Sequence, residues 1–148
     1  MAKGELLSKM ISLAVKAHEG QFDKAGVPYI LHCLKVMHYL KTDDEELQCI
    51  AIGHDLVEDT EVFLIDIMDN FTDRIADGIW ALTKQNDKTY EQYKAKVMTN
   101  PDAVRVKMCD LRHNMDIRRL KGIEPKDIER LARYAKFYQE LKELNNIP

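Results

Sequence analysis

One stretch of six residues, His54–Asp59 with the sequence HDLVED, constrains the chain more than any other. Four of its side chains can bind a metal ion or transfer a proton. Apolar residues precede it at the spacing of one helix face. Continuing that spacing predicts a helix to about Asp59, with His54 and Glu58 on its inward stripe. Charged groups are rarely buried without partners or a metal, so the fold must complete a polar site around this stretch.

Amphipathic spacing of the helical kind recurs along almost the whole chain. It covers residues 6–17, 30–37, 47–59, 62–68, 75–82, 90–97, 104–115 and 128–138. Glycines and Pro28 mark residues 20–29 as a loop, whereas Asn100-Pro101 and Glu124-Pro125 are typical helix starts. No segment shows a convincing strand pattern. The sequence therefore predicts an all-α, single-domain helical bundle of the whole chain, residues 1–148.

Composition excludes several classes of protein. The 148 residues, 45% of them hydrophobic and 32% charged, are typical of one soluble globular domain. A net charge of −3 gives no general electrostatic reason to bind nucleic acid or an anionic membrane. We find no signal peptide and no apolar run of the ~18 residues that a bilayer span needs. Cys33, Cys49 and Cys109 form no CxxC pair, which favours free thiols in a reducing cytoplasm.

The histidine and the aspartate that open the central stretch cannot form a metal site alone. Adjacent helical residues such as His54 and Asp55 point about 100° apart, so they share a metal only in a groove against neighbouring helices. His32, near the start of an earlier helix, and Asp110, on a polar face of a later one, are the candidates for the remaining ligands. Two imidazoles and two carboxylates suit Mn²⁺, Fe²⁺, Zn²⁺ or Ni²⁺ better than Ca²⁺.

Glu58 and Asp59 lie about one helical turn beyond the predicted metal ligands. A metal with open coordination positions would lower the pKa of a bound water. The two carboxylates would then be placed to orient that water or to take its proton. The stretch thus indicates a hydrolase with a metal and a pair of acids.

Several blocks of sequence carry a resemblance to a known family. They are His18, the segment Gly26–His32 (GVPYILH), the segment His54–Thr60 (HDLVEDT), and the segment Val106–Asp110 (VKMCD) with His113-Asn114-Met115. In this order and spanning nearly the whole chain, they resemble the hydrolase domain of the RelA/SpoT family, which belongs to the HD phosphohydrolases.

The resemblance implies an all-helical fold and hydrolysis of the 3′-pyrophosphate of ppGpp or pppGpp, typically with Mn²⁺. It assigns metal binding to His32, His54, Asp55 and Asp110, catalysis to Glu58 and Asp59, and contacts with substrate phosphate and ribose to Lys24 and Asn114. Lys107 and Arg112 are further candidates for offsetting phosphate charge. Because the chain has no room for the family's synthetase and regulatory domains, it resembles the small stand-alone alarmone hydrolases.

Two positions depart from the family pattern. Asp23-Lys24 stands where the family usually has Arg-Lys, and an acid cannot hold a guanine base as that arginine does. Asp110-Leu111-Arg112 replaces Asp-Arg-Leu, which moves a cation about 100° around the helix. Arg112 therefore either reaches a different phosphate or faces solvent. Because of these departures, the sequence does not decide which base the substrate carries.

Two alternative functions follow from the same residues. The site could act on another phosphorylated nucleotide: an adenosine alarmone, NADPH at its 2′-phosphate, or a nucleoside monophosphate. The chain could instead be a non-catalytic helical module that binds a nucleotide or a protein. The intact Glu58-Asp59 pair argues against that module, since a structural metal needs no acids acting on water. His18 is expected to be structural, spacing gives His38 and His113 no role, and the oligomeric state stays open.

Overall fold

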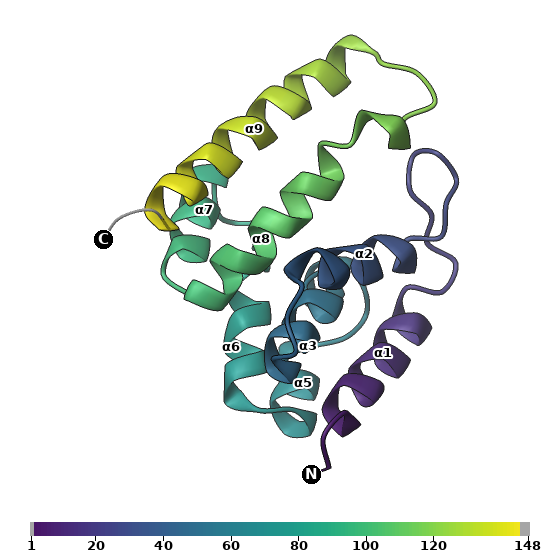
Figure 1. Ribbon diagram of the computed structural model, residues 1–148, viewed down its shortest axis with the longest axis vertical. Helices are drawn as coiled ribbons and strands as arrows, with labels where there is room; N and C mark the ends of the chain where they lie inside the picture. Colours follow the sequence, from purple (N-terminus) through teal and green to yellow (C-terminus); the bar gives the residue numbers. More distant parts are fainter. Residues whose placement is uncertain (1, 146–148) are drawn as a thin grey trace.

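The computed structural model describes residues 2–145 of the chain (Figure 1). Its elements are α1 Glu5–Ala17, α2 Ile30–Leu40, α3 Glu45–Gly53, α4 Leu56–Asp59, α5 Leu64–Asn70, α6 Asp73–Ala81, α7 Tyr90–Met98, α8 Pro101–Asn114, the 3₁₀ helix η1 Ile117–Arg119, and α9 Pro125–Asn145. Within residues 2–145, extended backbone pairs only at an isolated bridge between Phe22 and Pro28. The expectation of an all-α helical bundle is confirmed.

Capping side chains set the start of several helices. Asp44, Thr72 and Asn100 each accept a hydrogen bond from the backbone N–H three residues on, at the starts of α3, α6 and α8. Thr89 does the same for α7, where the Gln92 side-chain oxygen in turn accepts a hydrogen bond from the Thr89 backbone N–H. These bonds pair backbone donors that a helix start otherwise leaves open. Local sequence therefore fixes where α3 and α8 begin, and both helices lead to the candidate site.

The core is built around α3, which contacts α1, α2, α6 and α8 (Figure 1). Leu47 and every residue from Cys49 to Gly53 are buried. Gly78 lets α6 approach α3 closely, because a Cβ at that position would lie 2.5 Å from the Cδ1 atom of Ile50. A helix that is apolar on nearly all sides belongs in the interior. The residue that follows it, His54, is consequently delivered into the core.

The predicted continuation of this helix to Asp59 is wrong. α3 ends at Gly53, and Asp55 has φ −106° and ψ 2°, outside the α-helical path, before the single turn of α4. His54 is buried, whereas Glu58 is exposed and does not lie on an inward stripe. The apolar spacing before the stretch described α3 correctly, but the break at His54 and Asp55 redirects the residues that follow.

The segment between α1 and α2 is a structured loop beside the end of α8 (Figure 1). Gly20 and Gly26 both have φ +82°, a conformation that glycine adopts with little strain. Asp23 Oδ1 accepts hydrogen bonds from the backbone N–H groups of Ala25 and Val27, at 2.9 Å each. The carboxylate of Asp23 is therefore part of the loop's own turn.

None of the helices in residues 2–145 combines the length and the apolar character that a membrane crossing requires.

Candidate metal centre

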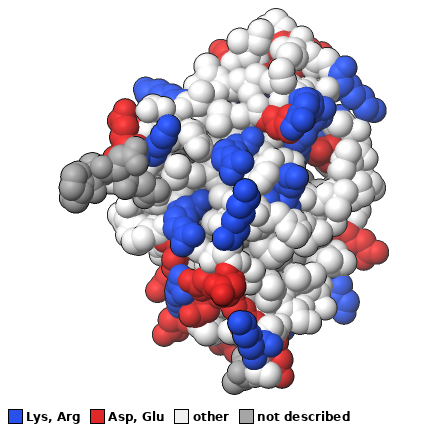
Figure 2. All heavy atoms as spheres, in the orientation of Figure 1, with Lys and Arg blue, Asp and Glu red and all other residues white. Residues whose placement is uncertain are grey.

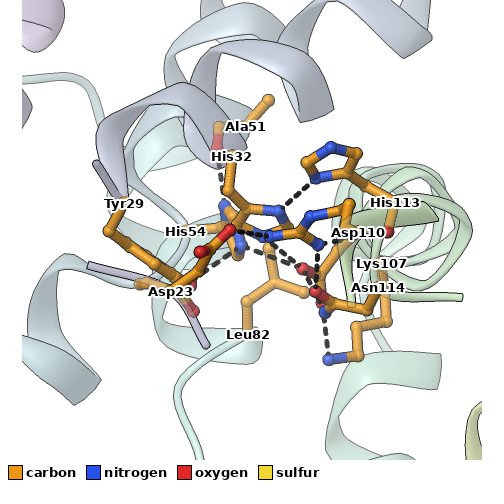
Figure 3. Close-up of polar contacts among 12 residues, drawn as sticks. Asp23, Tyr29, His32, Ala51, His54, Leu82, Lys107, Asp110, His113 and Asn114 are labelled. Carbon is orange, nitrogen blue, oxygen red and sulfur yellow. Dashed lines mark hydrogen bonds and ion pairs between the residues drawn. The ribbon is translucent and has the colours of Figure 1, made fainter. Parts of the chain in front are cut away.

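Three buried side chains from separate parts of the chain meet at one point (Figure 3). They are His32 from α2, His54 from the turn after α3, and Asp110 from α8, and one ligand atom of each lies within 4.8 Å of the others. Asp110 Oδ1 is 2.8 Å from His32 Nε2 and 3.3 Å from His54 Nε2. Asp55 adds a second carboxylate, with its Oδ2 atom 3.1 Å from His54 Nε2. The structure thus brings together all four predicted ligands.

The outer nitrogen of His54 has a fixed partner. His54 Nδ1 lies 2.7 Å from the carbonyl oxygen of Ala51, which can only accept, so this nitrogen carries a proton. The other nitrogen, Nε2, is buried and makes no hydrogen bond, although two carboxylates lie near it. A metal-binding histidine usually donates its outer N–H in this way. A buried Nε2 atom that makes no hydrogen bond and lies beside two carboxylates is suited to binding a divalent metal ion.

The two carboxylates are themselves held in place. Tyr29 donates its hydroxyl to Asp55 Oδ2. Lys107 Nζ lies 2.9 Å from Asp110 Oδ2, and Asn114 Nδ2 donates to Asp110 Oδ1 at 3.1 Å. Hydrogen bonds of this kind, made to the metal ligands by neighbouring side chains, orient the ligand oxygens and are typical of metal-binding sites.

Electrostatics around the cluster favour a cation. Burial alone would lower the pKa of His54, but the charges of Asp55 and Asp110 raise it well above its usual value. Burial would raise the pKa of Asp55, yet His54 lowers it to about 2. The pKa of Asp110 is well below its usual value despite burial, because of Lys107 and the two histidines. Both carboxylates are therefore anionic at neutral pH and attract positive charge to the point facing His54 Nε2.

Glu58 and Asp59 lie at the exposed edge of the cluster rather than inside it. Glu58 Oε1 accepts a hydrogen bond from the backbone N–H of Lys84 at 2.6 Å. Partial desolvation raises the pKa of both carboxyls, and the nearby charge of Asp55 raises it further. A carboxylate with a raised pKa is a better proton acceptor near neutral pH.

The candidate substrate residues differ in where they lie. Asn114 and Lys107 contact Asp110 directly, as described above. Lys24 is 55% exposed and pairs with Asp127 Oδ1 at 3.7 Å. Arg112 is exposed on α8 with its guanidinium carbon 4.2 Å from the centre of the Tyr39 ring. Figure 2 shows Lys and Arg side chains over the face where α2 and α8 lie. The structure does not bring Arg112 to the cluster.

Known proteins with similar sequences carry related names. A Vibrio cholerae protein named guanosine-3′,5′-bis(diphosphate) 3′-pyrophosphohydrolase is 32% identical over 143 residues, 87% of this chain and 20% of its own length. The Escherichia coli bifunctional (p)ppGpp synthase/hydrolase SpoT is 30% identical over 135 residues, 82% of this chain and 19% of its own length. The chain therefore spans about a fifth of the length of the curated relatives it matches. No protein-family model matches the chain.

A solved structure has the same fold. It is described as a metazoan orthologue of SpoT that hydrolyses ppGpp, and it superposes with a TM-score of 0.80 at 19% identity, over 99% of this chain and 89% of that one. The resemblance to the RelA/SpoT family is confirmed.

A hollow of about 650 Å³ is lined by His32 itself, and two smaller hollows lie close by. One, of about 290 Å³, reaches the cluster through Tyr29 and Asn114, and Lys24, Arg119 and Arg130 also line it. The other, of about 240 Å³, lies on the Glu58 side, since Lys84 lines it and donates its backbone N–H to Glu58. Lys88 and Lys96 line that second hollow as well.

Sequence reasoning missed most of the cations in these hollows. Lys84 and Lys88 belong to a polar link with no periodic pattern, so no spacing distinguishes them from solvated lysines. Arg119 is brought to the loop by tertiary structure: its Nη2 atom lies 3.4 Å from Asp23 Oδ2, and its Nη1 atom donates to Asn114 Oδ1 at 3.1 Å. The departure at Asp23 was visible in the sequence, but its arginine partner 96 residues away was not.

Proposed function

We propose that this protein is a metal-dependent hydrolase that removes the 3′-pyrophosphate of ppGpp and pppGpp, giving GDP or GTP and pyrophosphate. The observation that carries the proposal is the cluster of buried His32, His54 and Asp110 with half-buried Asp55, in which His54 Nε2 has no hydrogen bond. The names of the sequence relatives and the description of the structural neighbour support the same reaction. The buried free cysteines support a reducing, cytoplasmic location.

The four clustered side chains would hold Mn²⁺, which suits a set of imidazoles and carboxylates. When bound, such an ion supplies a Lewis acid for the phosphoryl group and lowers the pKa of water. Tyr29, Lys107 and Asn114 keep the two carboxylates oriented toward the ion.

Glu58 and Asp59 act on the attacking water in this proposal. Both lie beside the cluster, with their pKa raised by desolvation and by the charge of Asp55. Glu58 is held by the Lys84 backbone N–H through Oε1, which leaves its other oxygen free to accept a proton from water. Asp59 is available to orient the same water.

The two cationic hollows suit a nucleotide with two separate diphosphates. Lys24, Arg119 and Arg130 line one hollow together with Asp23 and Asp116, and Lys84, Lys88 and Lys96 line the other. A guanosine 3′,5′-bis(diphosphate) carries anionic groups on both sides of its ribose. We infer that each hollow takes one diphosphate, with the 3′-linked group on the Glu58 side.

A second candidate is hydrolysis of an adenine or other phosphorylated nucleotide at the same site. The observation that favours it is Asp23, whose Oδ1 atom is used by the loop and whose Oδ2 atom pairs with Arg119. The cation beside the loop is therefore Arg119 of η1, which donates hydrogen bonds to the His113 carbonyl and to Asn114 Oδ1. Because these bonds hold its guanidinium in place, it would contact a base differently from an unpaired arginine in the loop.

A hydrolysis panel with Mn²⁺ tests these candidates. The substrates are ppGpp, pppGpp, their adenosine analogues, NADPH and nucleoside monophosphates, and product release is measured by chromatography. Pyrophosphate release from ppGpp and pppGpp in preference to the others is the expected result. Preference for an adenine substrate would overturn the guanosine assignment. Turnover of none of them by metal-loaded protein would favour the non-catalytic binding module.

A further inference from the structure

Each histidine of the cluster turns one ring nitrogen inward and the other toward an outer partner (Figure 3). For His54 the outer partner is the Ala51 carbonyl, which can only accept a hydrogen bond. For His32 it is the imidazole of His113, with the two Nδ1 atoms 2.7 Å apart. An imidazole can donate or accept, so the direction of this second bond decides which nitrogen of His32 carries the proton.

The two rings meet edge to edge. Their centroids are 5.0 Å apart and their planes differ by 18°. A face-to-face stack cannot bring two nitrogens to 2.7 Å, because that distance is shorter than the contact between ring faces. Nearly parallel planes with the nitrogens between the centroids instead put the shared proton in the plane of both rings, which is the geometry of a strong hydrogen bond.

Only one direction of this bond is compatible with a metal at the cluster. If His113 donated, His32 would carry its proton on Nε2, which lies 2.8 Å from Asp110 Oδ1, and no lone pair would face the metal position. If His113 accepts, His32 is protonated on Nδ1 and Nε2 presents its lone pair to the cluster. The far side of His113 lines a hollow of about 650 Å³, where its own N–H can meet solvent.

We propose that His113 is a positioning residue: with a metal bound in place of the proton that His32 Nε2 shares with Asp110 Oδ1, His113 Nδ1 accepts the Nδ1–H of His32 and holds His32 in the metal-binding tautomer. This role rests on the proposed metal site and adds a residue to which spacing assigned nothing. His113 sits one turn after Asp110 on α8, so the same helix supplies one ligand and the partner that orients another. Arg119 fixes this part of α8 by donating to the His113 carbonyl at 3.1 Å.

The test compares Mn²⁺ affinity, measured by the electron paramagnetic resonance signal of free Mn²⁺, in the wild type and in His113 variants. His113→Phe keeps a ring but removes the acceptor, and we expect its Kd for Mn²⁺ to rise about 10- to 100-fold. His113→Asn keeps an oxygen acceptor near the position of Nδ1 and should return the Kd to within about threefold of wild type. His38→Phe, an exposed histidine on α2, is the matched control and should leave the Kd unchanged.

The outcomes separate this role from the proposed function. Wild-type affinity in folded His113→Phe overturns the role of His113 and leaves the metal site standing. Equal weakening in the Phe and Asn variants also overturns it, because ring shape rather than the acceptor would then matter. Absence of Mn²⁺ binding by the wild type overturns the proposed metal site itself. His113→Leu repeats the comparison if the phenylalanine variant fails to fold, which circular dichroism checks.

Discussion

A substitution at Glu58 separates the effect on catalysis from the effect on metal binding most clearly. Glu58→Gln keeps the oxygen that accepts from the Lys84 backbone N–H but removes the proton acceptor. We expect kcat for ppGpp to fall roughly 10²- to 10⁴-fold, the usual contribution of a general base, with Mn²⁺ affinity unchanged. Pyrophosphate release and a metal titration measure the two effects. Glu61→Gln, an exposed acid nearby, is the control. Full activity of Glu58→Gln would refute the role of Glu58.

The residues of the candidate site divide by how visible they are in the sequence. His54 and Asp55 stand out because ionisable residues follow an apolar run, and His32 and Asp110 because their blocks match a family. His113 lies in one of these blocks as well, but its role is not visible, since its partner His32 lies 81 residues away and only the tertiary structure joins their nitrogens. A single sequence reveals ligand types and local spacing, but it does not reveal which side chains pack behind a ligand.

At the scale of elements, the break after α3 shows that apolar helical spacing alone does not locate the end of a helix. The apolar spacing up to Ala51 is helical, and nothing in the HDLVED stretch signals a stop. The chain nevertheless leaves the helix where Gly53 packs tightly: a Cβ there would lie 2.9 Å from Ile79 Cδ1 and 3.0 Å from Met10 Sδ. Those neighbours come from α6 and α1, so the turn that aims His54 and Asp55 depends on contacts distant in sequence.

The approach of α6 to α3 gives a prediction about Gly78. Gly78→Ala places a Cβ 2.5 Å from Ile50 Cδ1 and 3.1 Å from its Cγ2, and this branched side chain has little freedom to move away. Overpacking of this kind costs about 1–3 kcal/mol, more than the ~1 kcal/mol that alanine gains in helix propensity. Urea unfolding should show a lower midpoint with an unchanged slope.

Gly122→Ala is the matched control for this change, because nothing lies within 4 Å of a Cβ there. We expect its free energy of unfolding to stay within about 0.5 kcal/mol of wild type. Equal stability of Gly78→Ala and wild type would show that Ile50 repacks freely, contrary to the tight α3–α6 contact.

Asp23 stabilises the loop between α1 and α2 in two ways, through hydrogen bonds within the turn and through an ion pair with Arg119, and two substitutions separate them. Asp23→Ala removes the acceptor for two backbone N–H groups, and we expect a loss of about 1–2 kcal/mol in the free energy of unfolding. Asp23→Asn keeps an acceptor oxygen and loses only the charge facing Arg119, so most of that stability should remain. Urea titrations of the two variants side by side measure the difference. Equal losses would show that the ion pair with Arg119, not the turn, stabilises the loop.

At the scale of the whole molecule, one metal would join three segments that are far apart in sequence. The ligand groups come from α2, from the turn after α3 and from α8. A ligand that binds only the folded protein stabilises it by about 2.7 kcal/mol at a hundred times its Kd. For a chain of this size we therefore expect Mn²⁺ to raise the Tm by roughly 5–10 °C, and EDTA to reverse the rise.

Asp110→Asn should abolish this Mn²⁺-dependent rise in Tm, because it removes the carboxylate whose Oδ1 atom lies within 3.3 Å of the Nε2 atoms of both histidines. Its Tm without metal changes separately, since the ion pair with Lys107 is also lost. The shift on adding Mn²⁺, rather than the Tm itself, is the quantity to compare. Asp87→Asn, an exposed aspartate in the link before α7, should keep the full shift. An undiminished shift in Asp110→Asn would place the metal away from the cluster.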